Sequence, residues 1–298
     1  MTRFGIDLGG TKTELAALDA RGAIVLRRRI ATPAGDYGEA LASLARLVTD
    51  AERELALSAT VGVGHPGAVD PATGFLHNAF ATVFNDRPFA TDLARVLSRE
   101  IRFENDANCF ALSEALDGAG AGCGVVFGVI LGTGAGAGIV VAGRLLRGGQ
   151  GWAGEGGHNP LPGMRPDEYP GPACACGRLG CIERFIAGPA LAEDFERATG
   201  RRLLPAEIAS AAQAEDPECR DCLDRHADRV GRALASAINL LDPDVIVLGG
   251  GLSRLERLAA DLPRRVAPHT YGGHCPPIRQ AAHGDSSGVR GAAMLWPA

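Results

Sequence analysis

The chain is 298 residues long and carries a formal net charge of −5 at neutral pH. This acidic balance gives no electrostatic reason to expect binding to nucleic acid or to an anionic membrane surface. Hydrophobic residues make up 46% of the sequence and charged residues 22%, which is typical of a globular protein with a sizeable core. A length near 300 residues favours two domains over one.

The eight cysteines are the second informative feature of the composition. Residues Met1–Asp7 read as the start of a strand rather than a basic region followed by an apolar stretch, so no signal peptide is expected. No apolar run approaches the roughly 18 residues of a membrane span. The cytoplasm is therefore the expected location, and there cysteines are more often thiols or metal ligands than disulfides.

Strand and helix patterns alternate along the chain and predict an α/β protein with mixed sheets. A three-stranded meander begins the chain, a helix with 3.6-residue apolar spacing follows Asp36, and the pattern restarts at Val125. The expected strands are Arg3–Leu8, Thr13–Leu18, Ala23–Ile30, Thr60–Val63, Ile101–Phe103, Val125–Leu131, Ile139–Ala142 and Val245–Leu248. The further expected helices are Phe89–Leu97, Asp106–Leu116, Ala190–Ala198, Pro205–Ala212, Cys219–Leu241, Leu252–Val266 and Val289–Leu295.

The restart of the pattern is a weak internal repeat. Phe4–Thr11 and Gly128–Gly134 are each a strand that ends in a Gly/Thr turn before another strand. We predict two α/β domains that face each other across a cleft, a favoured place for a small ligand. The expected domains are residues 1–117 together with 283–298, and residues 118–282.

Two glycine-rich turns, within Asp7–Lys12 and Gly132–Gly138, are candidate phosphate-binding sites. The first lacks the spacing of a Walker phosphate loop, and both continue into a strand rather than the helix that a dinucleotide-binding loop requires. Each turn can still present backbone N–H groups and a threonine hydroxyl to an anion, and Asp7 can position a hydrated Mg²⁺. Ordinary hairpins are the alternative, but a third glycine cluster at Gly249–Gly251 favours a nucleotide.

Three thiols fall within one short segment, at Cys174, Cys176 and Cys181, and His158 precedes them by a stretch rich in Pro and Gly. Three cysteines and one histidine make a closed tetrahedral zinc site, the structural type with no open position for catalysis. Buried or oxidised cysteines are the alternative, but thiols clustered this closely in a cytosolic protein favour zinc. The isolated CxxC at Cys219–Cys222 is expected to be inert.

The acidic candidates for catalysis lie at a strand end and beside the predicted metal site. Asp106 stands where a strand passes into a helix, so it can act as a general base or, as the alternative, as a helix cap. Its neighbour Asn105 offers both a donor and an acceptor to a hydroxyl. Glu155 and Glu183 add two carboxylates. Carboxylates that accept hydrogen bonds from hydroxyls, together with a base and Mg²⁺, suit phosphoryl transfer to a polyol.

Together these motifs resemble the ROK family of sugar kinases and repressors (repressor, open reading frame, kinase) over nearly the whole chain. Asp7–Lys12 is similar to its first phosphate motif, Leu131–Gly136 to its second and Asp242–Gly251 to its adenosine motif. Gly154–His158 with Cys174–Glu183 resembles the family signature. The resemblance implies the two-domain actin-like/hexokinase (ribonuclease H-like) ATPase fold with an interdomain cleft.

The resemblance also implies roles for individual residues, with Mg·ATP and a structural Zn²⁺ as cofactors. Asp106 would be the general base, and His158 would bind zinc through one ring nitrogen and the sugar through the other. Sugar contacts fall to Gly67, Asn105, Asp106, Glu155, His158 and Glu183, and metal ligation to His158, Cys174, Cys176 and Cys181. Nucleotide contacts fall to Asp7, Gly9, Gly10, Thr11, Lys12, Gly132, Thr133, Gly134, Gly136, Gly249, Gly250 and Gly251.

Within the family the sequence is most similar to bacterial fructokinases of the manno(fructo)kinase type, so D-fructose is the expected substrate and fructose 6-phosphate the expected product. The supporting segments are Thr32–Tyr37, Asn105–Cys109, Gly157–Pro162 and His283–Ala293. N-acetylglucosamine kinases and glucokinases share much of this pattern and are the alternatives. Gly156 and His65 depart from the usual residues at their positions, and both could lie close to the sugar.

Two hypotheses from other classes are weaker. A DNA-binding repressor of the family would need a winged-helix segment ahead of the first strand, and an acidic chain does not suit DNA. A sugar sensor without catalysis would have no need of Asp106 or of both phosphate turns. We therefore expect an ATP-dependent hexose kinase that forms a homodimer by family resemblance, with no nucleic-acid or membrane partner.

Overall fold

The structure is a computed structural model that describes residues 1–70, 72–77, 79, 81–255 and 258–297. The chain forms two compact units. Unit 1 contains residues 1–114, 145–153 and 285–298, and unit 2 contains residues 115–144 and 154–284. The segment Leu145–Ala153, which lies inside the second of the expected domains, belongs to unit 1. This segment is held there because Leu145 packs beside Cys109 and Arg147 forms an ion pair with Glu104.

Unit 1 is built on a five-stranded sheet in the order β3-β2-β1-β4-β7. The first three strands form the antiparallel meander expected at the N-terminus, and β4 and β7 extend the sheet in parallel. The strands are β1 (Arg3–Leu8), β2 (Lys12–Leu18), β3 (Ile24–Ala31), β4 (Thr60–His65) and β7 (Ile101–Asn105), with the small pair β5 (Ala68–Val69) and β6 (Leu76–His77) beside them in sequence.

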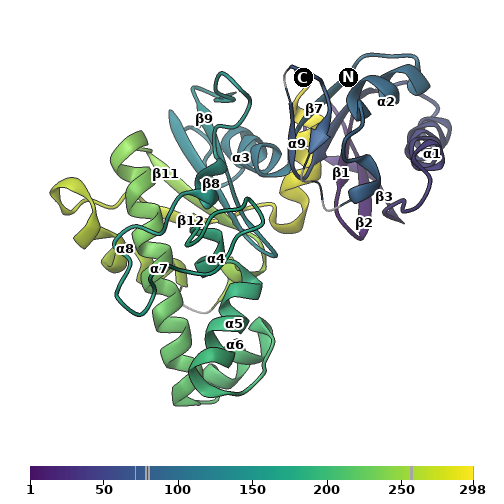
Figure 1. The fold of residues 1–298 in the computed structure, drawn as a ribbon. Helices are drawn as coiled ribbons and strands as arrows, with labels where there is room; N and C mark the ends of the chain where they lie inside the picture. The colour runs from purple at the N-terminus through teal and green to yellow at the C-terminus, as the bar shows by residue number, and fades with distance from the viewer. Residues whose placement is uncertain (71, 78, 80, 256–257, 298) are drawn as a thin grey trace. The chain divides into compact units, whose positions relative to one another are not determined.

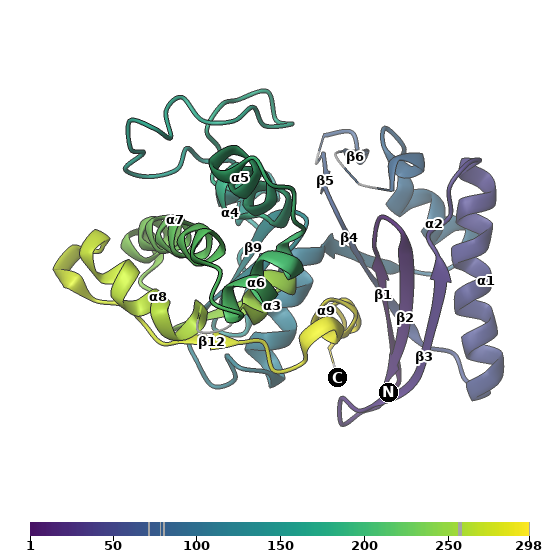
Figure 2. The same cartoon turned by 90° about the horizontal axis from the view of Figure 1, so that it is seen from below.

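Helices cover both faces of this sheet (Figures 1 and 2). α1 (Tyr37–Leu55) and α2 (Phe89–Leu97) pack on the face that receives the alternate side chains of β1 from Phe4 onwards. α9 (Ser287–Met294), drawn in yellow, lies against β1, β2 and β4 on the other face. Gly5 permits this approach, because a Cβ there would lie 1.9 Å from a backbone oxygen of α9.

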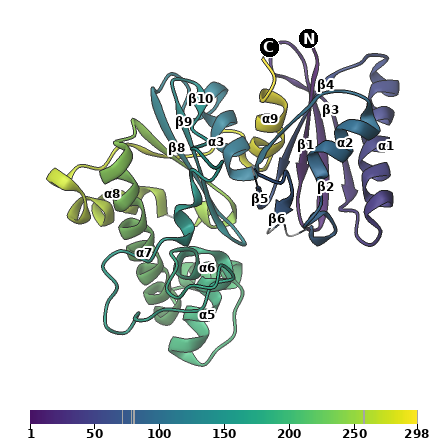
Figure 3. The same ribbon diagram turned by 45° about the horizontal axis from the view of Figure 1, so that its top comes forward.

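Unit 2 contains a second five-stranded sheet in the order β10-β9-β8-β11-β12, with β8 and β9 antiparallel and β11 and β12 parallel to β8. Figure 3 labels β8, β9 and β10 of this sheet. The two sheets therefore share one strand order, which is the structural form of the sequence repeat. The strands are β8 (Val125–Leu131), β9 (Ala135–Val141), β10 (Arg144–Leu145), β11 (Val245–Gly249) and β12 (Ile278–Gln280).

One strand starts earlier than the sequence indicated. The glycine-rich turn was expected to reach Gly138, but β9 already begins at Ala135. Gly136 and Gly138 pair with Ile130 and Gly128 across the antiparallel ladder, so they are strand residues. The turn is therefore only as long as a tight hairpin requires.

The remaining elements lie in unit 2, apart from η1 in unit 1 and from α3 and η6, each of which has residues in both units. The helices are α3 (Asp106–Asp117), α4 (Glu183–Ile186), α5 (Gly188–Thr199), α6 (Pro205–Gln213), α7 (Pro217–Leu241) and α8 (Leu258–Val266). The short 3₁₀ turns are η1 (Thr82–Phe84), η2 (Glu155–His158), η3 (Gly251–Arg254), η4 (Ala267–His269), η5 (Tyr271–Gly273) and η6 (Gly284–Ser286).

The helix expected at Leu252–Val266 corresponds to η3 and α8, and residues 256 and 257 between them lie outside the described part of the chain. Figure 3 shows α7 running alongside α8 within unit 2. Within the described ranges, none of the helices has the length and apolar character needed to cross a bilayer.

Candidate active site

The first glycine turn joins β1 to β2 in unit 1 and is held by hydrogen bonds. The backbone N–H of Gly9 donates to the carbonyl of Lys12 at 3.1 Å, and the hydroxyl of Thr32 donates to the carbonyl of Gly9 at 2.7 Å. Gly10, Thr11 and Lys12 are exposed. These bonds hold the turn while its tip stays accessible to a ligand. Thr32 directly follows β3, and its hydrogen bond to Gly9 stabilises the turn. The sequence around Thr32 did not indicate this role.

Asp7 precedes this turn on the face of β1 that α9 covers. A Cβ placed at Gly288 in α9 would lie 3.3 Å from the Asp7 carboxylate, a tight contact, so α9 packs closely against this side chain. Burial, and then the charge of Glu14, raise the pKa of Asp7 to about 6, while Lys12 opposes the shift. A carboxylate held at this energetic cost suits a role in binding a cation.

The start of α3 brings Gly67, Asn105 and Asp106 together within unit 1. Asp106 is the first residue of the helix. The Asn105 side-chain oxygen accepts hydrogen bonds from the backbone N–H groups of Ala107 at 2.8 Å and Asn108 at 3.3 Å. Its amide nitrogen donates to the carbonyl of Gly67 at 3.1 Å. Asn105 is therefore the side chain that caps α3, and this capping role leaves only part of its hydrogen-bonding capacity for a sugar.

His65 and Glu104 surround this helix start. His65 lies opposite Asn105 in the parallel pairing of β4 with β7, and its Nδ1 is 3.1 Å from the carbonyl oxygen of Pro66. Burial lowers the pKa of His65, so the ring is neutral near pH 7. Oε1 of Glu104 accepts hydrogen bonds from the backbone N–H of Asn105 and the side-chain amide of Asn108, both at 3.0 Å.

The second glycine turn, in unit 2, contacts the residue that follows the three thiols. The backbone N–H of Ala135 donates to Oε2 of Glu183 at 2.9 Å. The backbone N–H of Gly188 donates to the carbonyl of Gly132 at 2.7 Å, which ties the turn to the start of α5. The turn that contains Thr133 and Gly134 is thus positioned by α4 and α5.

Glu155 and His158 join the same group of residues. Both lie on η2, where Nε2 of His158 is 3.8 Å from Oε2 of Glu155. Burial raises the pKa of Glu155, His158 opposes this shift and Glu183 adds to it. The structure therefore brings together all three sugar-site residues that the sequence placed in this unit, and it sets them beside the second glycine turn.

The four expected metal ligands, His158, Cys174, Cys176 and Cys181, also converge. One ligand atom from each lies within 4.8 Å of all the others. Sγ of Cys176 is 3.6 Å from Sγ of Cys181, and Sγ of Cys174 is 3.5 Å from Nδ1 of His158. Ligands of a tetrahedral zinc with Zn–S bonds near 2.3 Å lie about 3.8 Å apart, so this donor set fits zinc.

The geometry around His158 separates its two ring nitrogens. Nδ1 faces the thiols and Nε2 faces Glu155. This is the orientation that the sequence analysis expected if one nitrogen binds metal and the other a ligand. Hydrogen bonds from the backbone and side chain of Arg178 lower the pKa of the Cys176 thiol to about 6, which favours the thiolate form that a metal requires.

The third glycine cluster follows β11 in the same unit. Gly250 has a φ of 81° and a Cβ there would lie 2.3 Å from the carbonyl oxygen of Leu131, so this turn packs directly on the end of β8. The second and third glycine clusters are therefore neighbours. Beyond them, a cavity of about 380 Å³ is lined by α6, α7, Leu255 and α8, with Ala209, Leu223 and Leu258 among its lining residues.

The CxxC pair is buried, as a structural role requires. Cys219 and Cys222 are both fully buried at the start of α7. Burial, followed by the charge of Asp194, raises the pKa of Cys222 to about 12. A thiol with this pKa is protonated near neutral pH and is a poor nucleophile.

Known proteins resemble the chain in both fold and sequence. A ROK hexokinase from Thermus thermophilus matches with a TM-score of 0.88 and 34% identity, over 99% of this chain and 97% of that one. A ROK family glucokinase from Streptomyces griseus, in complex with glucose and AMPPNP, matches with a TM-score of 0.80 and 28% identity over 99% of both chains. An N-acetyl-D-glucosamine kinase from Pectobacterium carotovorum is 38% identical over 297 residues, 98% of each chain.

These likenesses place the chain in a class and then in a family. The chain has the two-domain α/β fold of the actin-like/hexokinase class, as the sequence predicted. Residues 3–298 match the sequence model of the ROK family, and the chain belongs to that family.

Proposed function

We propose that the chain is an ATP-dependent kinase of a free hexose, with N-acetyl-D-glucosamine as its substrate. The observation that carries the proposal is the cluster in unit 2, where Glu155, His158 and Glu183 lie together beside the second glycine turn. Acceptors for sugar hydroxyls and backbone donors for phosphate therefore meet in one place, which is what transfer between the two ligands needs.

The choice of sugar changes from the sequence-based expectation. D-fructose was expected, but the N-acetyl-D-glucosamine kinase of Pectobacterium carotovorum is 38% identical over almost the full length of both chains. This relative supports an N-acetylated aminosugar in place of fructose. Glucose is the second candidate, because the Streptomyces griseus relative is a glucokinase seen in complex with glucose.

The proposed reaction gives a role to each candidate residue. A sugar hydroxyl attacks the γ-phosphorus of ATP, the bond from that phosphorus to the bridging oxygen breaks, and ADP leaves. Asp106 accepts the hydroxyl proton. The backbone N–H groups of the turns at Gly9–Lys12 and Gly132–Gly134 would bind phosphate oxygens, and Asp7 would hold a hydrated Mg²⁺, which supplies neutralising charge when bound. Gly67 and Asn105 complete the sugar contacts proposed for unit 1.

In this proposal zinc is structural. His158, Cys174, Cys176 and Cys181 would use all four tetrahedral positions, so the ion has no open position for substrate. Its contribution would be to orient His158, whose Nε2 already faces Glu155. We further propose that the adenine ring enters the cavity beside Leu255, because Leu255 ends the short η3 turn that begins at Gly251.

A coupled assay of ADP release with Mg·ATP tests the proposed function. The panel is N-acetylglucosamine, glucose, fructose, mannose and N-acetylmannosamine, with zinc-loaded protein. We expect the highest kcat/KM with N-acetylglucosamine. A preference for glucose or fructose would retain the kinase and overturn the substrate. No turnover with any sugar from folded, zinc-loaded protein would overturn the kinase in favour of a sensor without catalysis.

A further inference from the structure

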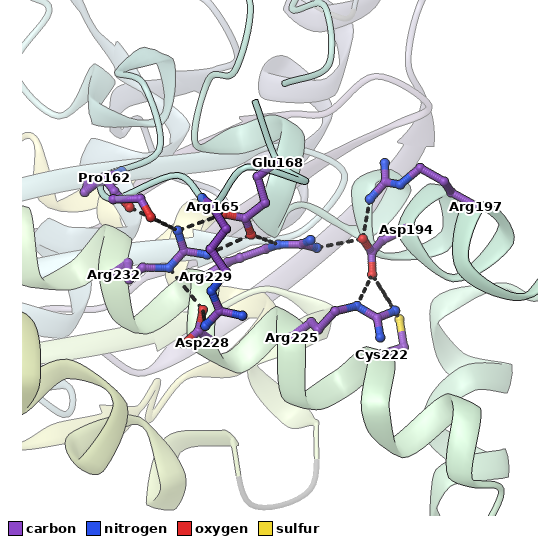
Figure 4. A network of polar contacts seen from close by, with 11 residues as sticks. Pro162, Arg165, Glu168, Asp194, Arg197, Cys222, Arg225, Asp228, Arg229 and Arg232 are labelled. Carbon is purple, nitrogen blue, oxygen red and sulfur yellow. Dashed lines mark hydrogen bonds and ion pairs between the residues drawn. The ribbon is translucent and has the colours of Figure 1, made fainter. Parts of the chain in front are cut away.

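A buried ionic cluster connects the segment that carries the thiols to the long helix α7 (Figure 4). We call residues 159–182, which include Cys174, Cys176 and Cys181, the metal loop. Glu168 lies in this loop between His158 and Cys174 and is 6% exposed. Arg229 and Arg232 on α7 are equally buried, at 4% and 3%. None of the three residues belongs to the proposed sugar, nucleotide or metal sites.

Glu168 receives an unusually complete set of hydrogen bonds. Its Oε1 accepts from Nε of Arg229 and from Nη2 of Arg232, both at 2.8 Å. Its Oε2 accepts from Nη1 of Arg232 at 2.9 Å and from the backbone N–H of Arg165 at 3.0 Å. Arg232 therefore grips the carboxylate with both arms of its guanidinium group, the geometry in which an ion pair is strongest and most directional.

Arg232 and its neighbour Asp228 also hold other parts of the loop. Nη1 of Arg232 also donates to the carbonyls of Pro162 at 3.1 Å and Gly163 at 2.9 Å. Asp228 lies one turn before Arg232 on α7, and its carboxylate forms an ion pair with Arg165 of the loop at 3.0 Å. Figure 4 shows these loop groups directed at α7. The part of the metal loop from Pro162 to Glu168 is thus fixed to α7 through groups other than the four metal ligands.

The face of α7 that binds the metal loop also contacts α4, the short helix that begins with Glu183. Nε2 of His226 lies 2.9 Å from the carbonyl oxygen of Ile186 at the end of α4. The guanidinium carbon of Arg229 lies 5.5 Å from the centre of the Phe185 ring. One face of α7 therefore contacts both the loop that holds the thiols and the short helix that carries Glu183.

The contact between the metal loop and α7 depends strongly on the charge of Glu168. Burial raises the pKa of Glu168, but hydrogen bonds from Arg232, Arg165 and Arg229 outweigh this effect and lower the pKa to about 2. Glu168 is therefore ionised near neutral pH. Arg229 has a second acidic partner, Asp194 on α5, at 2.8 Å. Asp194 contacts Arg197, Cys222, Arg225 and Arg229, and none of these four residues lies in the metal loop.

We infer that Glu168, Arg229 and Arg232 are positioning residues that anchor the metal loop to α7 and so place Glu183 and the metal ligands for the sugar. They act without touching either substrate. The ends of the loop are also paired through the backbone, since the N–H of Leu161 donates to Gly180 and that of Ile182 to Asn159. The ionic cluster adds the contact with α7, and without it the Pro162–Glu168 part of the loop would retain more conformational freedom, which would weaken a site that depends on exact placement.

Asp194 supplies a matched control, because Asp194→Asn and Glu168→Gln each remove a buried acidic partner of Arg229, and only Glu168 belongs to the loop. The comparison uses zinc-loaded protein and four measurements. These are thermal stability, the rate of zinc release to a chromophoric chelator, tryptic cleavage of the Arg178–Leu179 bond in the loop, and the KM for sugar and for ATP.

We expect both variants to lose thermal stability, because each leaves a buried arginine short of a partner. Only Glu168→Gln should release zinc about tenfold faster or more, be cleaved faster at Arg178, and show a raised KM for N-acetylglucosamine with an unchanged KM for ATP. If the two variants matched in all four measurements, or if Glu168→Gln left zinc release and the KM for sugar unchanged, the inference would be wrong.

Arg232→Lys is the second variant, should Glu168→Gln fail to fold. It keeps the charge but loses the two-armed contact, so it should show the same selective effects at smaller size. The kinetic readout rests on the proposed function, whereas zinc release and cleavage at Arg178 do not. A wild-type chain that turned over no sugar would therefore overturn the proposed function and leave this inference to be decided by those two measurements.

Discussion

The backbone N–H of Ala135 donates a hydrogen bond to Oε2 of Glu183 at 2.9 Å. Ala135 begins the strand after the second glycine turn, and Glu183 begins the helix after the metal loop. The predicted phosphate side and the predicted sugar side of unit 2 are therefore joined by one hydrogen bond. A change that displaces Ala135 should therefore also displace the Glu183 carboxylate. Two adjacent glycines on η2, Gly156 and Gly157, test this, because only Gly157 packs against Ala135.

Gly156 and Gly157 differ in the space around them. A Cβ on Gly156 would have no heavy atom within 4 Å, whereas a Cβ on Gly157 would lie 2.4 Å from the carbonyl oxygen of Ala135. We expect Gly156→Ala to change the free energy of unfolding by less than about 0.5 kcal/mol and Gly157→Ala to lower it by about 1–3 kcal/mol. Denaturant unfolding of the two variants measures this difference.

The kinetic effects should also diverge. Gly157→Ala should raise the KM for sugar, because it displaces the backbone that holds Glu183. Gly156→Ala should alter the ratio of kcat/KM between N-acetylglucosamine and glucose if its open space accepts part of the sugar. Equal stability of the two variants would contradict the packing described for η2.

Asp106→Asn tests the proposed base. The variant keeps the size of the side chain and removes its ability to accept a proton, so kcat should fall by about 10²-fold or more while calorimetry still detects sugar binding. Asp117→Asn, at the other end of the same helix, serves as the control and should retain kcat. A loss of less than about tenfold, equivalent to ~1.4 kcal/mol, would rule out Asp106 as the base.

Elements with a clear periodicity were predictable from the sequence. The helix Phe89–Leu97 and the strand Val125–Leu131 have the bounds that their apolar patterns indicate. The strand β9 was placed too late because Gly136 and Gly138 resemble turn residues, and only their pairing with β8 makes them strand residues. The place of Leu145–Ala153 depends on contacts with residues distant in sequence, which no local pattern reveals.

The candidate site divides in the same way. The cluster of His158 with the three thiols follows from spacing and chemistry alone, because few other structures need those residue types so close together. The capping role of Asn105 and the anchor at Glu168 were not predicted. Glu168 and the neighbouring Asp167 stand in a Pro/Gly-rich segment where no local pattern marks either one, and the partners of Glu168, Arg229 and Arg232, lie on a helix far along the chain. The spacing of the motifs also could not predict which sugar is the substrate, because the motifs serve chemistry that the whole family shares.

Cys176→Ser tests the proposed metal site. Cys176 is the most exposed of the four ligands, so its loss should disturb packing least while removing one donor. We expect elemental analysis to show substoichiometric zinc, and activity to fall through weaker sugar binding. Cys123→Ser, at a half-buried thiol outside the cluster, should keep full zinc and full activity. A full equivalent of zinc in Cys176→Ser would contradict the ligand set.

Ala209→Trp tests the proposed adenine site. The larger side chain should fill part of the cavity of about 380 Å³ and raise the KM for ATP without changing the KM for sugar. Ser210 lies next to it on α6 but does not line the cavity, so Ser210→Trp is the control and should leave both constants unchanged. Unchanged ATP kinetics in a folded Ala209→Trp variant would place the adenine elsewhere.

Asp7→Asn should stabilise the protein while it removes activity. Burial raises the pKa of Asp7 from 3.8 to about 6, so near neutral pH the folded chain holds a carboxylate whose charge the fold disfavours. Because the pKa of Asp7 is higher in the folded than in the unfolded chain, the free energy of unfolding is not lowered by this group below about pH 4. It falls as the pH rises from about 4 through 6 and Asp7 becomes ionised in the folded state. The neutral amide avoids this loss, which amounts to at most about 3 kcal/mol above pH 6.

Thermal unfolding from pH 4 to pH 8 checks the sign of this effect. The advantage of Asp7→Asn over wild type should be largest at pH 7–8 and disappear near pH 4, while Asp50→Asn on the outer side of α1 should follow wild type throughout. Since a protonated Asp7 no longer attracts Mg²⁺, kcat/KM for Mg·ATP in wild type should fall as pH drops through about 6. A variant that is less stable than wild type at pH 7.5, or that keeps wild-type turnover, would show that Asp7 neither bears this electrostatic cost nor serves the nucleotide.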